Sequence, residues 1–140
     1  MCCNALGSNS LCPFYYDAIS DATLQAEMLA GRKLLCNPIF DRCDRFIETL
    51  QQAFELNSST KAILVCPARF SNQWFIDLCE NRNFKVVAYY PPGTKLFTGG
   101  KKTAPFSITD RQTYNQGTVE PIAVFELSDN HRMYPTVTLE

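Results

Sequence analysis

The amino-acid sequence predicts an α/β fold whose sheet is mainly parallel. Short apolar runs of strand length alternate with amphipathic helical segments, and the links between them are short. From residue 33 to residue 90 the order is strand, helix, strand, helix, strand. This βαβαβ order is typical of a parallel sheet with right-handed crossover connections.

Three runs supply the expected strands. Lys33 to Asn37 is short and apolar, and it follows Gly31, which suits the left-handed residue after a short helix from Asp21 to Leu29. Ala62 to Cys66 is apolar throughout and ends at a proline, which is the pattern of a central parallel strand buried on both faces. Phe84 to Tyr90 is the third expected strand.

Two amphipathic helices are expected to connect these strands. Between the first two strands, apolar residues repeat at spacings of three and four from Cys43 to Phe54, and Asp41 is the expected N-cap. The second helix has its apolar side between Trp74 and Cys79. A last strand, Pro121 to Leu127, is expected to return to the sheet.

Length and composition limit the classes of protein to which the chain can belong. With 140 residues, of which 46% are hydrophobic, it suits one domain, here residues 1–127, followed by a tail at 128–140. A formal net charge of -1 argues against a globally basic nucleic-acid-binding protein. No apolar run approaches the length of a membrane span, so no membrane partner is expected.

The seven cysteines indicate an intracellular protein of the cytoplasm or the nucleus. Their number is odd and no secretory signal precedes them, so most are expected to be thiols, and those from Cys36 to Cys79 should act as small apolar residues. Zinc is disfavoured because no CxxC pair occurs and His131 is the only histidine. We therefore expect no metal site and no cysteine nucleophile.

Residues 82–111 form a locally basic segment with interleaved aromatic residues. The segment contains six cationic residues and a single acidic residue, Asp110. The cations are Arg82, Lys85, Lys95, Lys101, Lys102 and Arg111. Basic and stacking side chains together are what DNA phosphates and unstacked bases require. A solvated loop whose lysines only keep it soluble is the alternative interpretation.

The stretch Asn37-Pro38-Ile39-Phe40 stands where the first strand ends and the next helix is about to begin. Open α/β sheets bind ligands at the carboxyl ends of their strands, and an asparagine there can read the edge of a base. The same residues also make a common turn between a strand and a helix. They indicate a site only in combination with other segments.

Four segments, in the same order and at similar spacing, resemble the phage-type DNA adenine-N6 methyltransferase family, and most closely the domains carried in retrotransposon polyproteins. The segments are Gly7 to Tyr16, Cys36 to Phe40, Val65 to Arg69 with Trp74-Phe75, and Lys95 to Phe106. The resemblance covers most of residues 7–127. It implies a Rossmann-like three-layer sandwich and a methyltransferase that uses S-adenosylmethionine.

The resemblance also implies roles for individual residues. Asn37 and the carbonyl of Pro38 would accept hydrogen bonds from the exocyclic amine of the target adenine, and Phe40 would stack on the base after it has left the duplex. The polar candidates near the cofactor are Asn9 and Asp21. The candidate DNA contacts are Arg69, Lys95, Lys101, Lys102 and Arg111.

The chain departs from the family pattern at two points. Ile39 stands where the family motif has a second proline, so the turn should be less rigid. In the family, an acidic residue and a strand that contribute to the cofactor pocket lie before the position of Met1. We therefore expect a fold that is truncated at its N-terminus.

These features leave two functional hypotheses of different classes. The first is a DNA adenine-N6 methyltransferase domain, and the alternative is a catalytically inactive module of the same fold that binds nucleic acid or serves as a scaffold. In either case a homo-oligomer or a larger assembly would cover the sheet edge that a missing strand leaves.

Overall fold

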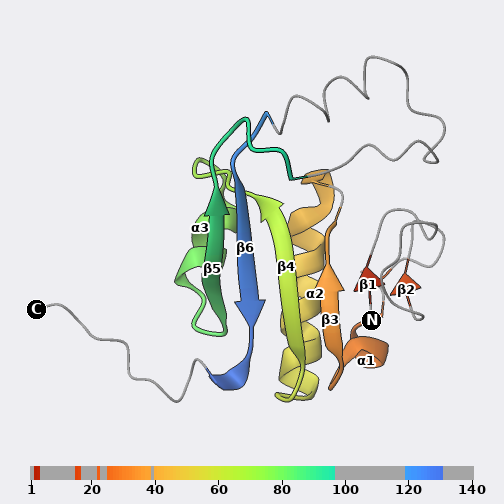
Figure 1. Ribbon diagram of the computed structural model, residues 1–140. Coiled ribbons are helices and arrows are strands. Elements are labelled where there is room, and N and C mark those ends of the chain that lie inside the picture. The colour runs from red at the N-terminus through yellow and green to blue at the C-terminus, as the bar shows by residue number, and fades with distance from the viewer. Residues whose placement is uncertain are drawn as a thin grey trace, which may run out of the picture.

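A mixed six-stranded sheet forms the centre of the computed structural model, with its strands in the order β2-β1-β3-β4-β6-β5 (Figure 1). The longer strands are β3 (Lys33–Cys36), β4 (Lys61–Pro67), β5 (Phe84–Tyr90) and β6 (Ile122–Leu127). Two short strands, β1 (Cys2–Cys3) and β2 (Tyr15–Tyr16), extend one edge. The structure describes residues 2–3, 15–16, 22, 25–38, 40–96 and 119–130.

Two helices, α2 (Cys43–Leu56) and α3 (Gln73–Glu80), cover the same face of the sheet and lie behind it in Figure 1. α2 connects β3 to β4, and α3 connects β4 to β5. A short helix, α1 (Ala26–Leu29), precedes β3, and a 3-10 turn, η3 (Phe40–Arg42), precedes α2. This alternation confirms the α/β class and the predicted order of strands and helices.

Among the four longer strands the pairing is not mainly parallel, which corrects the prediction. β3 and β4 are parallel, whereas β6 is antiparallel to both β4 and β5. β5 ends and β6 begins at the same end of the sheet, as their antiparallel pairing requires (Figure 1). An apolar run indicates a buried strand, but not its direction or its neighbours. The predicted strand at Pro121 to Leu127 therefore exists, and its place between β4 and β5 is new.

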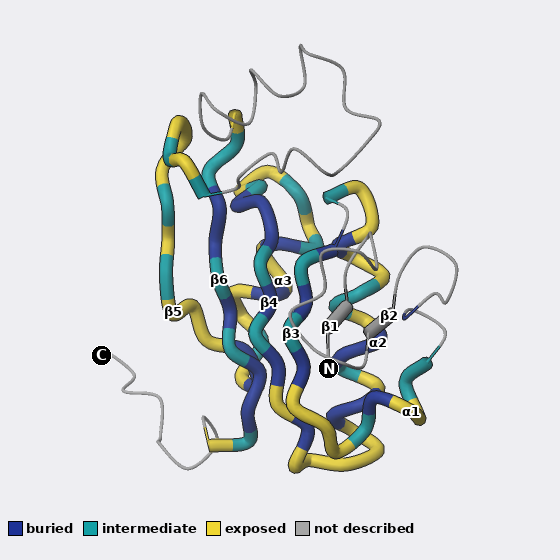
Figure 2. The backbone as a smooth tube through the Cα atoms, turned by 45° about the vertical axis from the view of Figure 1, so that its right-hand side comes forward, coloured by how far each residue is buried: buried dark blue, intermediate teal, exposed yellow. Residues whose placement is uncertain are grey.

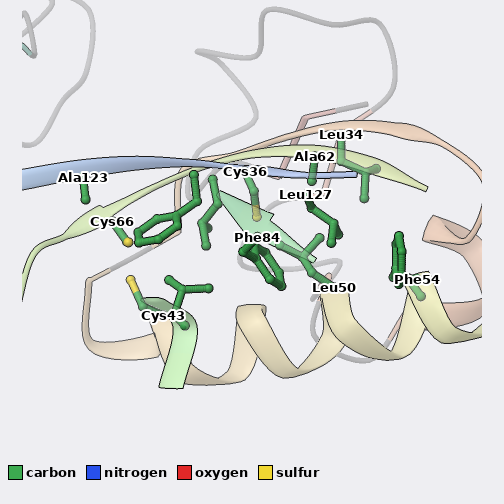
Figure 3. Close-up of a cluster of buried hydrophobic side chains, with 14 of the residues drawn as sticks. Leu34, Cys36, Cys43, Leu50, Phe54, Ala62, Cys66, Phe84, Ala123 and Leu127 are labelled. Atoms are coloured by element: carbon green, nitrogen blue, oxygen red, sulfur yellow. The ribbon is translucent and has the colours of Figure 1, made fainter. Parts of the chain in front are cut away.

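The hydrophobic core lies between the sheet and the two helices (Figures 2 and 3). Leu64 of β4 and Phe125 of β6 are completely buried on this face, in the same cluster as Leu50 of α2. Each such side chain contributes roughly 1.5–3 kcal/mol through burial. On the opposite face Ile63 and Val65 are half-buried. The expectation that this strand is buried on both faces therefore holds for one face only.

β5 is an outer strand of the sheet and carries a bulge. Its pairing with β6 shifts between Val86 and Ala88, so Val87 is the extra residue on this strand. This outer strand carries three exposed apolar side chains, Val86, Val87 and Tyr89.

Gly31 occupies the conformation that was predicted for the residue after the first helix, because it follows α1 with φ 78°. A Cβ atom at this position would lie 2.6 Å from Nδ2 of Asn57. That amide cannot move aside easily, since its Oδ1 accepts hydrogen bonds from the N–H and the hydroxyl of Ser59, at 3.0 and 2.6 Å. Gly93 has a similar φ of 88°, but a Cβ atom there would meet nothing within 4 Å.

The two glycines form a matched pair for a stability measurement. Gly93→Ala should lower the free energy of unfolding by about 1–2 kcal/mol, the cost of a left-handed non-glycine residue. Gly31→Ala carries the same backbone cost and must also displace Asn57, so it should lose about 1 kcal/mol more. Urea unfolding of both variants measures the difference. Equal losses would contradict the crowding at Gly31.

Candidate functional site

Three segments meet at the edge of the sheet where β3 and β4 end, at the top of Figure 1. Asn37-Pro38 follows β3, and Ala68-Arg69 follows β4. Because β6 runs in the opposite direction, its first residues lie at the same edge, and the Ala68 N–H donates to the carbonyl of Pro121 at 2.8 Å. We call this place the carboxyl edge, since ligands of α/β sheets bind at the carboxyl ends of the parallel strands.

The predicted adenine-binding turn lies at this edge. Asn37 is half-buried, and its side chain makes no hydrogen bond to any residue in the described ranges. Pro38 is buried, and Ile39 lies outside the described residues. Phe40 is half-buried and packs against the core, so only part of its ring is accessible. The turn thus offers an amide side chain that its described neighbours leave unengaged.

The start of α2 differs from the prediction, in which Asp41 was the N-cap. The η3 turn intervenes, so the N-cap residue is Arg42 and it provides no side-chain hydrogen bond to the helix. Asp41 instead directs one carboxylate oxygen toward Arg69, with 3.8 Å between Oδ1 and Nη2. The spacing of apolar residues shows where the helical face begins, but it does not reveal a preceding 3-10 turn.

Arg69 is held mainly by Glu120, the residue just before Pro121. Nε and Nη2 of Arg69 donate to the two carboxylate oxygens of Glu120 at 2.8 and 3.2 Å. This pair raises the pKa of Arg69, first through its hydrogen bond and then through the charge of Glu120. Arg69 was predicted to contact DNA, and its charge is already compensated in the structure. A DNA phosphate would have to bind the part of the guanidinium that Glu120 does not use.

Two thiols face each other beneath the carboxyl edge, one from β4 and one from the first residue of α2 (Figure 3). Cys43 and Cys66 are both buried and form no disulfide. Burial raises the pKa of Cys43 to about 12, and the positive charge of Arg69 opposes this shift. Burial also raises the pKa of Cys66, with a smaller contribution from the neighbouring Cys43. Both thiols therefore act as neutral, apolar side chains, as predicted from the sequence.

Of the remaining predicted site residues, only Lys95 belongs to the part of the chain that the structure describes. Lys95 is exposed at the carboxyl edge, after a turn in which the Thr94 hydroxyl donates to the Pro91 carbonyl at 2.6 Å. The others lie outside the described residues, and their roles stay predictions: Asn9, Asp21, Lys101, Lys102 and Arg111.

Sequence reasoning missed two features of this edge. Glu120 was not recognised, because only the placement of β6 beside β4 brings it to Arg69. Phe70 was also overlooked; its side chain is 64% exposed and lies beside Tyr89, with 6.4 Å between the ring centroids. The proline and the Arg-Phe pair that follow the apolar run of β4 were the only sequence signal that could have drawn attention to this loop.

Comparison of the chain with models of protein families, with curated proteins and with solved structures finds no match. In the part of the chain that the structure describes, no helix has both the length and the apolar character needed to cross a bilayer.

The raised pKa values of the buried thiols predict a loss of stability at alkaline pH. In the unfolded chain these thiols ionise from about pH 9, whereas in the folded state they stay protonated. Their contribution is therefore complete below about pH 9 and is lost as the pH rises toward the folded pKa, by up to about 1.4 kcal/mol per pH unit for each thiol. Cys43→Ala should flatten the fall of the unfolding free energy between about pH 9 and about pH 11.

The exposed Cys79 provides the control for this experiment. Cys79→Ala should change the slope less than Cys43→Ala, because Cys79 loses less contact with water on folding. Urea unfolding across the pH series gives both slopes. Identical slopes in the two variants would show that the burial of Cys43 does not control its ionisation.

Proposed function

We propose that the chain is a DNA adenine-N6 methyltransferase-like domain, which transfers a methyl group from S-adenosylmethionine to a flipped adenine. The observation that carries the proposal is the position of Asn37-Pro38. The turn leaves the carboxyl end of β3, and the side chain of Asn37 is half-buried and not engaged by a described residue. Such an amide can form directed hydrogen bonds with a ligand at the edge where α/β sheets bind ligands.

The chemistry of the turn suits an exocyclic amine. Oδ1 of Asn37 and the carbonyl oxygen of Pro38 are both acceptors, so together they can hold the two hydrogens of the adenine amino group. This interaction draws the lone pair of the nitrogen out of the ring and directs it toward the methyl donor. The new N–C bond would form as the S–C bond of the donor breaks, and the nitrogen would then release one proton to solvent. Bound S-adenosylmethionine would supply an electrophilic methyl group, with Asn9 and Asp21 as the residues proposed to hold it. The exposed part of the Phe40 ring would stack on the base.

The strand directions support the same proposal. β3 and β4 are parallel and are joined by α2, which packs on the sheet, and this is the repeating unit of Rossmann-like sheets. β4 and β5 also run in the same direction, because both are antiparallel to β6, which lies between them. We therefore also propose that the sheet is Rossmann-like, with β6 as an inserted antiparallel strand.

An inactive nucleic-acid-binding module is the second candidate, and the exposed aromatic pair Phe70 and Tyr89 favours it. Both rings belong to the carboxyl edge, where β4 and β5 end, and Tyr89 is 50% exposed. Exposed aromatic rings stack on unpaired bases of any sequence. Together with Lys95 they would bind single-stranded DNA whether or not methyl transfer occurs.

Methyl transfer is tested with Asn37 variants of the full chain. Binding of S-adenosylmethionine is first measured by calorimetry, and methylation of adenine-containing DNA is then followed with labelled cofactor. Asn37→Ala should abolish methylation because one acceptor is lost, whereas Asn37→Asp should keep part of it because the acceptor oxygen remains. Asn130→Ala, at the opposite edge, is the control. Unchanged turnover in Asn37→Ala would disprove the site, and absence of cofactor binding would leave the second candidate.

If the chain is a nucleic-acid-binding module, the contributions of aromatic stacking and of charge to DNA affinity should be separable. Phe70→Ala and Tyr89→Ala should each weaken binding of single-stranded DNA by about 1–3 kcal/mol without altering its dependence on salt. Lys95→Ala should reduce the slope of log affinity against log salt by about 0.7. Leu56→Ala, exposed at the far end of α2, is the control. If all three variants bind as tightly as the control, this edge does not bind DNA.

A further inference from the structure

The guanidinium of Arg69 has two partners of very different strength. Glu120 binds one edge of the guanidinium through Nε and Nη2, in a side-on pair that fixes its plane. This geometry leaves Nη1 and the second N–H of Nη2 pointing away from Glu120. The Arg69 side chain is 26% exposed, so part of it is in contact with solvent.

Among the described residues, Asp41 is the only carboxylate other than Glu120 that forms an ion pair with Arg69, and it is held weakly. Its Oδ1 lies 3.8 Å from Nη2, which is too far for a hydrogen bond, and its side chain is 90% exposed. An exposed ion pair of this length contributes little, because water solvates both charges almost as well. An anion that reached the same edge with a short, two-pronged contact would form a stronger interaction.

The surroundings of Asp41 also favour an anion at this place. Asp41 stands one residue before the N-cap of α2, a helix of 14 residues. The positive end of the helix dipole therefore lies close to Asp41, whose Oδ1 is 3.8 Å from Nη2 of Arg69. Asp41 also follows Phe40 directly, so an anion at this edge would be adjacent to the proposed adenine-binding turn. A phosphate next to the flipped nucleotide has the chemistry and the position that this edge requires.

We propose that Arg69, oriented by Glu120, binds a backbone phosphate of nucleic acid with its free edge, and that Asp41 occupies this edge until the phosphate displaces it. Asp41 thus acts as an internal competitor that lowers the affinity for nucleic acid. The inference rests on the proposed DNA-binding function of the carboxyl edge, but it requires no methyl transfer.

The test compares two neutralising substitutions in the same turn of the chain. Asp41→Asn removes the competitor, whereas Asp44→Asn removes the same charge from the first turn of α2, where no ion pair with Arg69 forms. Affinity for a fluorescent, adenine-containing oligonucleotide is measured by anisotropy at fixed ionic strength. Asp41→Asn should bind about 1.4- to fivefold more tightly than the unmodified chain, the range expected for release of an exposed ion pair. Asp44→Asn should gain clearly less.

The Arg69→Lys variant tests whether the gain in oligonucleotide affinity from Asp41→Asn depends on the guanidinium of Arg69. Lysine keeps the charge but loses the fork that Glu120 orients, so Asp41→Asn should have no effect in the Arg69→Lys background. Circular dichroism and urea unfolding confirm that each variant is folded. Equal gains in Asp41→Asn and Asp44→Asn, or an undiminished gain from Asp41→Asn in the Arg69→Lys background, would overturn the proposal.

Further outcomes would overturn this inference or separate it from the proposed function. An absence of oligonucleotide binding by both the unmodified chain and Asp41→Asn would overturn it, as would displacement of the oligonucleotide by inorganic phosphate at low millimolar concentration, which would indicate a general anion site. Loss of methyl transfer with the Asp41 effect intact would remove the methyltransferase assignment alone. Methyl transfer that depends on Asn37, without any Asp41 effect, would remove this inference alone.

Discussion

The pairing of β6 with strands on both of its sides is the constraint on which the rest of the structure depends. Backbone hydrogen bonds join it to β4 along one edge and to β5 along the other. β4 and β5 would otherwise be linked only through α3 and the core. The same pairing brings the residues before β6 to the end of β4, where Glu120 meets Arg69. A strand late in the chain thus completes a site whose other residues come much earlier.

Opposing effects set the electrostatics of this edge. Arg69 is stabilised by Glu120, while burial raises the pKa of the Cys43 thiol and keeps it neutral despite the nearby positive charge of Arg69. Glu120 and Asp41 both pair with Arg69, so the charge of this arginine is largely compensated. Specific geometry, rather than net charge, would therefore determine what binds there. This agrees with a formal net charge of -1 for the whole chain.

The sequence predicted the four longer strands and α2 well, the short strands β1 and β2 not at all, and the spatial relations of the elements less well. The apolar runs of β3, β4, β5 and β6 and the periodicity of α2 were sufficient, because burial patterns are local. The antiparallel direction of β6 was not predictable, because it follows from the position of β6 between β4 and β5, which depends on tertiary packing. Within the site, Asn37 and Arg69 were identified from their positions after strands, whereas the contacts of Glu120 and Asp41 with Arg69 depend on tertiary packing.

The bulge in β5 affects the tendency of the protein to aggregate through its outer strand. Phe84 to Tyr90 has seven residues rich in β-branched and aromatic side chains, with Lys85 as its only charge. An exposed edge of this composition can template aggregation by pairing with the same edge of another molecule. The extra residue at Val87 divides the edge into two shorter runs whose registers differ. A straight incoming strand can match only one of them, so the bulge makes growth of an extended intermolecular sheet unfavourable.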